Sequence, residues 1–474
     1  MFGSNSRKRI LIIIAAGLVF LLCSFFTWSN IHNAKIYSNL PPLVNQWDEN
    51  SRLLVFAPHS DDETIGAAFL IQEVLAARGT VKIVLFTNGE AFTYDSENTA
   101  NNKLEAKDYI SLGYKRQKET QTAMSLLGVK QEDIIFLGYP DGSLKRLWQN
   151  NWDEDNPYTS LTLGLPFSPY QNSYQDHPLF YGQNIAEALK EIIAQYRPNL
   201  IVLPHPKDNH PDHWAAGAFV KYTLAIMDYQ ADLELLYLVH QNSWPYRYFS
   251  KPIVPLLPPA NLLSGGTDWY KLPAASSGIE QKKAALDEYK SQLDLIRRYL
   301  YSFVRKNELF GLYDDISLPD NALPDRLIKP SGENELIRNP APTGLLRKSR
   351  DLRSLHGELS MEGNLHFFLV ISNESANELS YQLNGVLISH GESRRFYLKL
   401  EGEQYSMNNM PLEAEMNIER NGSIIHITLP LQPFLKYDHL FLAAECYAGE
   451  DLRDKTNWRM ITLPATSGSF AARE

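Results

Sequence analysis

Short, continuously apolar runs alternate with longer amphipathic segments between residues 52 and 313. The apolar runs are rich in Val, Ile and Leu, as buried parallel strands are. They lie at 53–56, 81–86, 134–137, 200–203 and 235–239. Helical patterns follow at 64–77, 115–127, 185–196, 213–227 and 281–303. This alternation predicts an α/β domain over residues 51–313, with a mostly parallel sheet and helices on both of its faces.

Two polar inserts interrupt the alternation, at 89–113 and 141–183. Both are rich in Asn, Asp and aromatic residues. Loops this long inside a compact domain are either functional or disordered, and the aromatic content argues against disorder. We therefore expect the inserts to form walls of a substrate groove. Trp148 and Trp152 are either platforms on which sugars stack or core residues of the second insert.

A chain of 474 residues is too long for one ordinary domain, and its sequence pattern changes after residue 313. Residues 314–352 are irregular and rich in proline, which predicts a linker. Residues 353–474 contain short runs typical of strands, separated by turn residues, and Asn421-Gly422 marks a hairpin between two of them. These features predict a β-sandwich-like accessory domain. It either binds carbohydrate or covers the catalytic domain.

An apolar run of another kind lies near the N-terminus. Residues 10–28 carry no charge and are long enough to span a bilayer as a helix, and Arg7-Lys8-Arg9 precedes them. This charge pattern predicts a cytoplasmic basic tail at 1–9, a single-pass anchor at 10–28 and a polar stalk at 29–50. The catalytic domain would then lie outside the cytoplasm. A cleaved signal peptide is the alternative, although its apolar region is usually shorter.

The charge and the cysteine content argue against nucleic-acid binding and against a disulfide. The net charge of −10 argues against nucleic acid as a partner. The two cysteines, Cys23 in the apolar run and Cys446 near the C-terminus, do not predict a disulfide, so the exported part depends on its hydrophobic core.

Chemically active side chains follow two of the predicted strands directly. His59, Asp61 and Asp62 come after the run at 53–56, and His210 and His213 come after the run at 200–203. Open α/β folds build their sites where strands end and helices begin. A catalytic zinc site needs three protein ligands and one open position. His59 and Asp62 can face one point because they are three residues apart, and His213 can supply the third ligand.

The remaining side chains of the two motifs have the chemistry of a hydrolase. Asp61 stays free as a general base for water. His210 is placed to stabilise an oxyanion or to protonate a leaving group. Asp208 or Asp212 could orient an imidazole. The alternatives are structural, because consecutive acids after a strand often cap a helix and a His-x-x-His pair is often solvated.

With these residues the chain resembles the PIG-L/LmbE-like zinc-dependent N-acetylglucosaminyl deacetylases. Residues 58–63 look like their His-Pro-Asp-Asp-Glu motif, with serine at position 60 in place of proline, and residues 210–213 look like their second motif. The resemblance implies a Rossmann-like fold, and Zn²⁺ held by His59, Asp62 and His213. It also implies Asp61 as the base and His210 as an electrostatic or acid catalyst. Arg116 and Asp141 would contact the substrate.

The sequence therefore predicts a zinc-dependent de-N-acetylase that acts on N-acetylglucosamine units of a glycan or glycoconjugate. A metal-dependent amidase with a non-sugar substrate and a non-catalytic glycan-binding protein are the alternatives. Iron(II) accepts the same ligands as zinc. Two positions stay open: Glu90 either touches the sugar or closes its loop, and His240 either reaches the site or is a buried core histidine.

Overall fold

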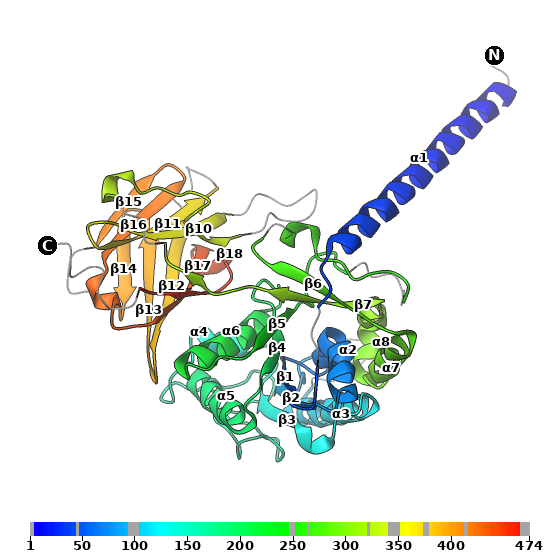
Figure 1. The fold of residues 1–474 in the computed structure, drawn as a ribbon, viewed down its shortest axis with the longest axis horizontal. Coiled ribbons are helices and arrows are strands. Elements are labelled where there is room, and N and C mark those ends of the chain that lie inside the picture. The colour runs from blue at the N-terminus through cyan, green and yellow to red at the C-terminus, as the bar shows by residue number, and fades with distance from the viewer. Residues whose placement is uncertain are drawn as a thin grey trace.

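The computed structural model describes residues 4–43, 47–92, 104–245, 252–263, 265–319, 323–339, 351–372, 379–411 and 416–464. Figure 1 shows a long N-terminal helix, an α/β domain with helices on both faces of its sheet, and a C-terminal β domain. The predicted fold class is thereby confirmed. Much of the first insert, the end of the predicted linker and the last ten residues lie outside the described residues.

The central sheet contains β1 Arg52–Ala57, β2 Thr80–Thr87, β3 Ile134–Tyr139, β4 Leu200–Pro204, β5 Leu233–Tyr237, β6 Asp268–Pro273 and β7 Asn307–Leu312. Their spatial order is β3-β2-β1-β4-β5-β7-β6. Strands β1 to β5 pair in parallel, whereas β7 pairs antiparallel with both β5 and β6. The five predicted strands thus form the parallel part of the sheet, and the antiparallel edge is an addition.

Alternate side chains of β1 enter two different hydrophobic cores. Leu53 and Val55 pack on one face and Leu54 and Phe56 on the other, and all four are fully buried. The first core also contains residues of α2 Asp62–Ala76, α3 Ala106–Leu126, α7 Ser276–Leu286 and α8 Lys290–Leu300. The second contains residues of α4 Leu144–Gln149, α5 Gly182–Tyr196 and α6 Pro211–Ile226. Burial on both faces explains why the strand sequences are apolar without alternation.

One predicted helix differs from the structure, and one open alternative in the second insert is decided. The pattern at 281–303 forms two helices, α7 and α8, because Tyr289 between them is fully buried and its hydroxyl contacts the side chains of Glu63 and Thr64 at 2.5 and 2.7 Å. In the second insert, Trp148 is fully buried and has edge-to-face contacts with aromatic rings of α6 and of the β domain. Trp148 is therefore a core residue and not an exposed platform.

A buried ion pair joins α7 to the antiparallel edge of the sheet. The Lys282 ammonium lies 2.7 Å from the Glu308 carboxylate, and both side chains are almost fully buried. The carboxylate also accepts hydrogen bonds from the main-chain N–H groups of Phe69 and Leu70. Glu308 therefore holds α2 and α7 against β7.

Replacing Lys282 with methionine should lower the free energy of unfolding by about 3 kcal/mol, because it leaves a buried carboxylate without its cation. Urea unfolding of the purified chain, followed by circular dichroism, measures this loss. Lys283→Met is the matched control, since Lys283 forms an exposed pair with Asp287 and should change stability by no more than about 0.5 kcal/mol. Equal effects of the two substitutions would show that the buried pair is not needed.

The β domain contains two mostly antiparallel sheets that pack as a sandwich. One sheet contains β9 Glu335–Arg338, β10 Leu352–Leu359, β11 Asn364–Ile371, β15 Asn417–Asn421 and β16 Ile424–Pro430. The other contains β8 Ile316–Ser317, β12 Leu379–Ser389, β13 Glu392–Glu401, β14 Gln404–Asn408, β17 His439–Ala448, β18 Asp451–Lys455 and β19 Arg459–Thr462. Asn421 pairs with Ile424 across the predicted hairpin, and Gly422 in the turn has a φ of 58°. Strands β8 and β9 lie within the segment predicted as a linker.

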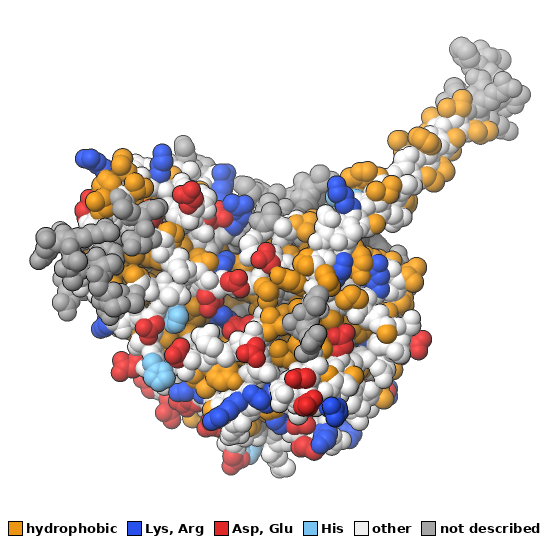
Figure 2. Space-filling view, in the orientation of Figure 1, with side chains coloured by type: hydrophobic (Ala, Val, Ile, Leu, Met, Phe, Trp, Pro, Cys, Tyr) orange, Lys and Arg blue, Asp and Glu red, His pale blue; other side chains and the backbone are white. Residues whose placement is uncertain are grey.

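The N-terminal helix, α1 Ser4–Asn39, continues well beyond the predicted anchor. Among the described residues, Ile12–Asn39 is long and apolar enough to cross a membrane, a criterion that a signal sequence also meets. Figure 2 shows hydrophobic side chains along much of this helix.

The segment that follows α1 is docked on the α/β domain. Leu40 is buried, and the N–H of Leu43 donates to the Lys271 carbonyl on β6 at 2.8 Å. The Lys271 ammonium donates to the Tyr37 carbonyl at 2.7 Å, and the Lys306 ammonium lies 3.8 Å from the centre of the Tyr37 ring. Residues 37–43, which were expected to form part of a polar stalk, are thus held against the edge of the sheet.

Candidate active site

The two polar motifs meet at the carboxyl ends of β1 and β4, which are neighbouring parallel strands. From β1 the strand order runs to β2 and β3 on one side and to β4 and β5 on the other. The connections therefore reverse direction between β1 and β4, and open α/β sheets bind ligands at such a point. The sequence motifs predicted this location because each follows a buried strand directly.

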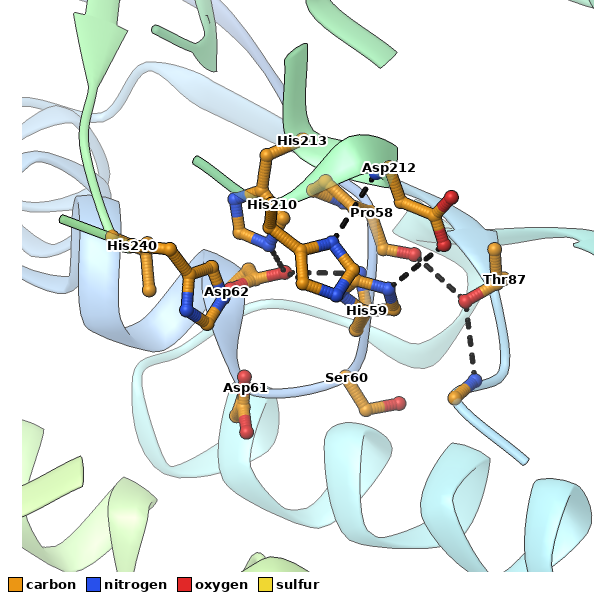
Figure 3. Close-up of polar contacts among 12 residues, drawn as sticks. Pro58, His59, Ser60, Asp61, Asp62, Thr87, His210, Asp212, His213 and His240 are labelled. Atoms are coloured by element: carbon orange, nitrogen blue, oxygen red, sulfur yellow. Dashed lines mark hydrogen bonds and ion pairs between the residues drawn. The ribbon is translucent and has the colours of Figure 1, made fainter. Parts of the chain in front are cut away.

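The three predicted metal ligands lie together, with the rings of His59 and His213 both facing the carboxylate of Asp62 (Figure 3). Its Oδ2 lies 3.2 Å from Nδ1 of His59 and 3.1 Å from Nε2 of His213. The main-chain N–H of His59 donates to the same oxygen at 3.0 Å, which closes the turn between β1 and α2. The carboxylate sits in the first turn of α2, where the partial positive charge of the helix end favours an anion.

The environment of His213 fits a metal ligand. Its side chain is fully buried, and its ring nitrogens lie 3.1 Å from Asp62 and 3.4 Å from Asp208. Neither nitrogen has hydrogen-bond geometry with any partner among the described residues. Buried imidazole nitrogens normally have partners, so this arrangement fits a cation between the side chains.

Three overlapping sets of side chains bring their possible ligand atoms within 4.8 Å of one another. The sets are His59, His210 and His213; Asp62, His213 and His240; and His59, Asp141 and Asp212. Each predicted ligand belongs to at least one set. Imidazole and carboxylate groups suit zinc and also iron(II), so the donor set fits the predicted metal.

Asp61 lies beside these ligands in a strained backbone conformation. Its φ is 104°, a region that residues other than glycine rarely adopt, and such strain is concentrated at functional sites. Burial, together with the charge of Asp62, holds the pKa of the Asp61 carboxyl well above its usual value, although Arg116 opposes the shift. A carboxylate with a raised pKa is a better base for a proton from water.

His210 presents a hydrogen-bond donor to the site. It precedes α6, and its Nδ1 accepts the main-chain N–H of Asp212 at 3.2 Å. Burial and the neighbouring ring of His59 lower the pKa of His210 to about 3, so the ring is neutral. With Nδ1 as the acceptor, the proton of the neutral ring is assigned to Nε2.

A cavity of about 300 Å³ opens beside this cluster. One side is polar and includes Asp61, Arg116 and Asp141, whereas the other contains apolar side chains such as Ile296 and Leu300 of α8. This volume is at the lower end of the range for ligand pockets, so it suits one sugar ring and not an extended chain.

Of the three predicted substrate contacts, Asp141 and Arg116 line the cavity, whereas Glu90 does not. Asp141 lines the cavity, and its Oδ1 lies 3.1 Å from Nε2 of His59. Arg116 also lines it, but its guanidinium donates to the main-chain oxygens of Gly89 and Ser60 at 2.5 and 3.0 Å. Glu90 is fully buried and accepts the N–H of Asp141 at 2.9 Å, which favours its loop-closing role. Burial and the charge of Asp141 raise the pKa of Glu90 to about 8.

Three further polar residues take part in the site, and the sequence left their roles undecided. Asp208 accepts the N–H groups of His210 and His240 at 2.9 Å and thereby orients His213 between two carboxylates. Asp212 accepts the N–H of Gly142 at 2.7 Å and lies 3.2 Å from Nε2 of His59. His240 lines the cavity, where its ring centre is 4.5 Å from that of His213. Their positions directly after β4 and β5 were the available signal.

Fold and side chains together define an α/β protein with a candidate metal centre at the switch point of its sheet. The chain contains a PIG-L domain: residues 54–224 match the model of this family, which is described as GlcNAc-PI de-N-acetylase. The resemblance found in the two motifs is thus confirmed.

A relative from Kineococcus radiotolerans is 1D-myo-inositol 2-acetamido-2-deoxy-α-D-glucopyranoside deacetylase, 27% identical over 172 residues. The alignment covers 36% of this chain and 44% of the relative, so the chain spans less than half of the relative's length.

Similar solved structures include N,N'-diacetylchitobiose deacetylase from Pyrococcus horikoshii, with 18% identity, a TM-score of 0.36 and coverage of 56% of this chain and 84% of that chain. Another is teicoplanin deacetylase in its zinc-inhibited form, with 16% identity, a TM-score of 0.36 and coverage of 56% of this chain and 100% of that one.

Proposed function

We propose that this protein is a membrane-anchored, zinc-dependent hydrolase that removes the acetyl group from N-acetylglucosamine-type sugars outside the cytoplasm. The observation that carries the proposal is the shared position of Asp62 between His59 and His213, with Asp61 and His210 beside them at one cavity. Support also comes from the PIG-L match and from the names of the relatives, which act on N-acetylated sugars.

His59, Asp62 and His213 would hold the metal. A bound zinc ion would supply a Lewis acid that polarises the amide carbonyl and makes water more acidic. Asp208 fixes the orientation of His213, and Asp212 and Asp141 do the same for His59. Such supporting contacts fix the tautomer and orientation of each ring and make its neutral form a stronger metal ligand.

Asp61 and His210 would have different roles in the reaction: Asp61 transfers the proton, and His210 stabilises the negative charge. Asp61 accepts a proton from the water that attacks the carbonyl carbon of the acetamido group. The Nε2–H of His210 donates a hydrogen bond to the carbonyl oxygen as it gains negative charge. When the C–N bond breaks, the proton held by Asp61 passes to the amine nitrogen. Water thus supplies the oxygen of acetate and a hydrogen of the free amine.

The proposed location depends on the N-terminal helix. The apolar segment that begins at Ile12, with the cationic residues 7–9 before it, favours a single-pass anchor with its N-terminus in the cytoplasm. The α/β domain and the β domain would then be outside.

The test is release of acetate by the full chain in detergent. We expect the zinc-loaded protein to release acetate from N-acetylglucosamine or its conjugates, and a chelator to abolish the release until zinc is restored. The substrates are N-acetylglucosamine, its oligomers and lipid-linked forms, and the control is the same set with a chelator present throughout.

The other outcomes assign the alternatives. Metal binding without acetate release from any of these sugars would overturn the sugar substrate and favour an amidase for a non-sugar amide. A chain that binds saccharides but neither binds metal nor releases acetate would favour a non-catalytic glycan-binding protein.

A further inference from the structure

A second hollow lies between the α/β domain and the β domain. It has a volume of about 790 Å³ and is bounded by α4, by residues 150–153 after it, and by the outer face of the β-domain sheet that contains β12 and β17. We call it the interdomain cleft; its lining includes Gln149, Asn384, Arg395, Tyr397, Asn408 and Glu445. It shares no lining residue with the cavity beside Asp61. Helix α4 connects the cleft to the catalytic cavity, because it lines the cleft and the N–H of its first residue, Leu144, donates to Asp212 at 2.9 Å.

The outer face of this β-domain sheet divides into an apolar and a polar half. Alternate residues of β12 and β17 point to this face. One half packs into the second core of the α/β domain and consists of Val386, Ile388, Phe441 and Ala443. The other half lines the cleft and consists of Gln382, Asn384, Glu445 and Tyr447. The apolar half provides the hydrophobic contact between the domains, whereas the polar half lines the cleft and reaches the α/β domain through the hydrogen bond between Gln149 and Glu445.

The polar half is organised around a buried carboxylate. Glu445 is 3% exposed and accepts hydrogen bonds from the side-chain amides of Gln149 and Asn384, each at 2.9 Å. It also accepts the Tyr447 hydroxyl at 2.6 Å. Amide groups from both domains are therefore held in one orientation before any ligand arrives, which reduces the entropic cost of binding.

Arg395 supplies a donor without a partner. Its guanidinium carbon lies 4.2 Å from the centre of the Trp148 ring and 4.0 Å from that of Trp152, and Nη2 donates to the Trp148 carbonyl at 2.5 Å. Nη1 is buried and has no hydrogen-bond partner among the described residues. Because buried donors are normally satisfied, a ligand oxygen in the cleft is the natural acceptor.

The rim adds an aromatic face and another amide. Tyr397 is 37% exposed and pairs across the strands with Asn408, which is also exposed. Charges in the lining are balanced, with Lys145, Arg394 and Arg395 against Asp153, Glu445 and Glu450. Planar amide, guanidinium and carboxylate groups satisfy neighbouring hydroxyls in pairs, and an aromatic ring packs on the C–H face of a sugar.

We propose that the interdomain cleft binds a neutral saccharide chain and is a second carbohydrate site, separate from the catalytic cavity. The inference rests on the proposed function, which it deepens: the substrate is a glycan chain that the protein holds at a distance from the reacting unit. An extended peptide is less favoured, because peptides add to the open edge of a sheet and this cleft presents the face of one.

The test is hydrogen–deuterium exchange of the full chain in detergent with a tetramer of N-acetylglucosamine, in an Asp61→Asn background so that the probe is not consumed. We expect protection of β12 to β14, in addition to any protection around His59 and His213. A Tyr397→Ala/Asn408→Ala pair should weaken binding to the cleft by about tenfold or more. Tyr405→Ala is the control, since Tyr405 is an exposed tyrosine on β14 outside the lining.

Two results would overturn the proposal. One is that neither the N-acetylglucosamine tetramer nor a glucose tetramer, each at millimolar concentration, protects β12 to β14 from exchange. The other is protection by a neutral tetrapeptide but by neither saccharide, which would assign the cleft to peptides. Neither readout depends on turnover, so a failure of the deacetylase activity itself appears separately in the acetate assay.

Discussion

Replacing Asp61 with asparagine should lower kcat for acetate release by about a thousandfold, the usual contribution of a general base. Asparagine has nearly the same shape but cannot accept the proton of the attacking water. It also adopts positive φ more readily than most residues, so the strained turn at 104° should be kept. The bound zinc, measured by mass spectrometry of the purified protein, should stay at the wild-type amount.

Asp228→Asn is the matched control. Asp228 also has a positive φ, of 49°, but it is exposed and lies after the end of α6, away from the cavity. Its replacement should leave kcat unchanged. Loss of zinc from the Asp61 variant would mean that Asp61 is a ligand and that its role has been exchanged with that of Asp62. Full activity would remove Asp61 from the reaction.

Replacing His213 with alanine should weaken zinc binding by at least about a hundredfold, since changes to groups that only support a ligand already cost 10- to 100-fold. Acetate release at limiting zinc should fall in parallel. The reason is geometric: His213 is fully buried between Asp62 and Asp208, so its replacement removes one nitrogen ligand from the metal. Equilibrium dialysis with zinc measures the affinity directly.

Two further variants distinguish the possible ligand sets. His59→Ala should weaken zinc binding as strongly as His213→Ala, whereas His240→Ala should retain most of the affinity. The opposite order would favour the set of Asp62, His213 and His240, whose possible ligand atoms lie within 4.8 Å of one another. Unchanged affinity in the His213 variant would exclude both sets.

The parallel strands could be predicted because burial on both faces makes their sequences continuously apolar. The antiparallel edge could not, because β6 and β7 mix polar and apolar residues without a clear period. The division of 281–303 into two helices depends on a contact of Tyr289 with α2, more than 200 residues away in the sequence. Local pattern carries no information about such a contact.

The main site residues could be predicted for a similar reason. Motifs that directly follow two buried strands come together if those strands are neighbours, and β1 and β4 are. Arg116 shows the limit, because its observed partners are main-chain oxygens, which no side-chain pattern reveals. His240 depends on the pairing of β5 with β4, which the sequence does not encode locally.

The docked end of α1 has a consequence for how the enzyme would reach its substrates. In the proposed orientation about 20 residues of the helix cross the bilayer. The remaining turns, at 29–39, would raise the domain by roughly 16 Å. Because Tyr37 and Leu43 are fastened to β6 and its surroundings, the catalytic cavity cannot swing on a loose tether. It would work at a constant height above the lipid, so substrates would be selected by the distance of their acetamido group from the membrane as well as by their chemistry.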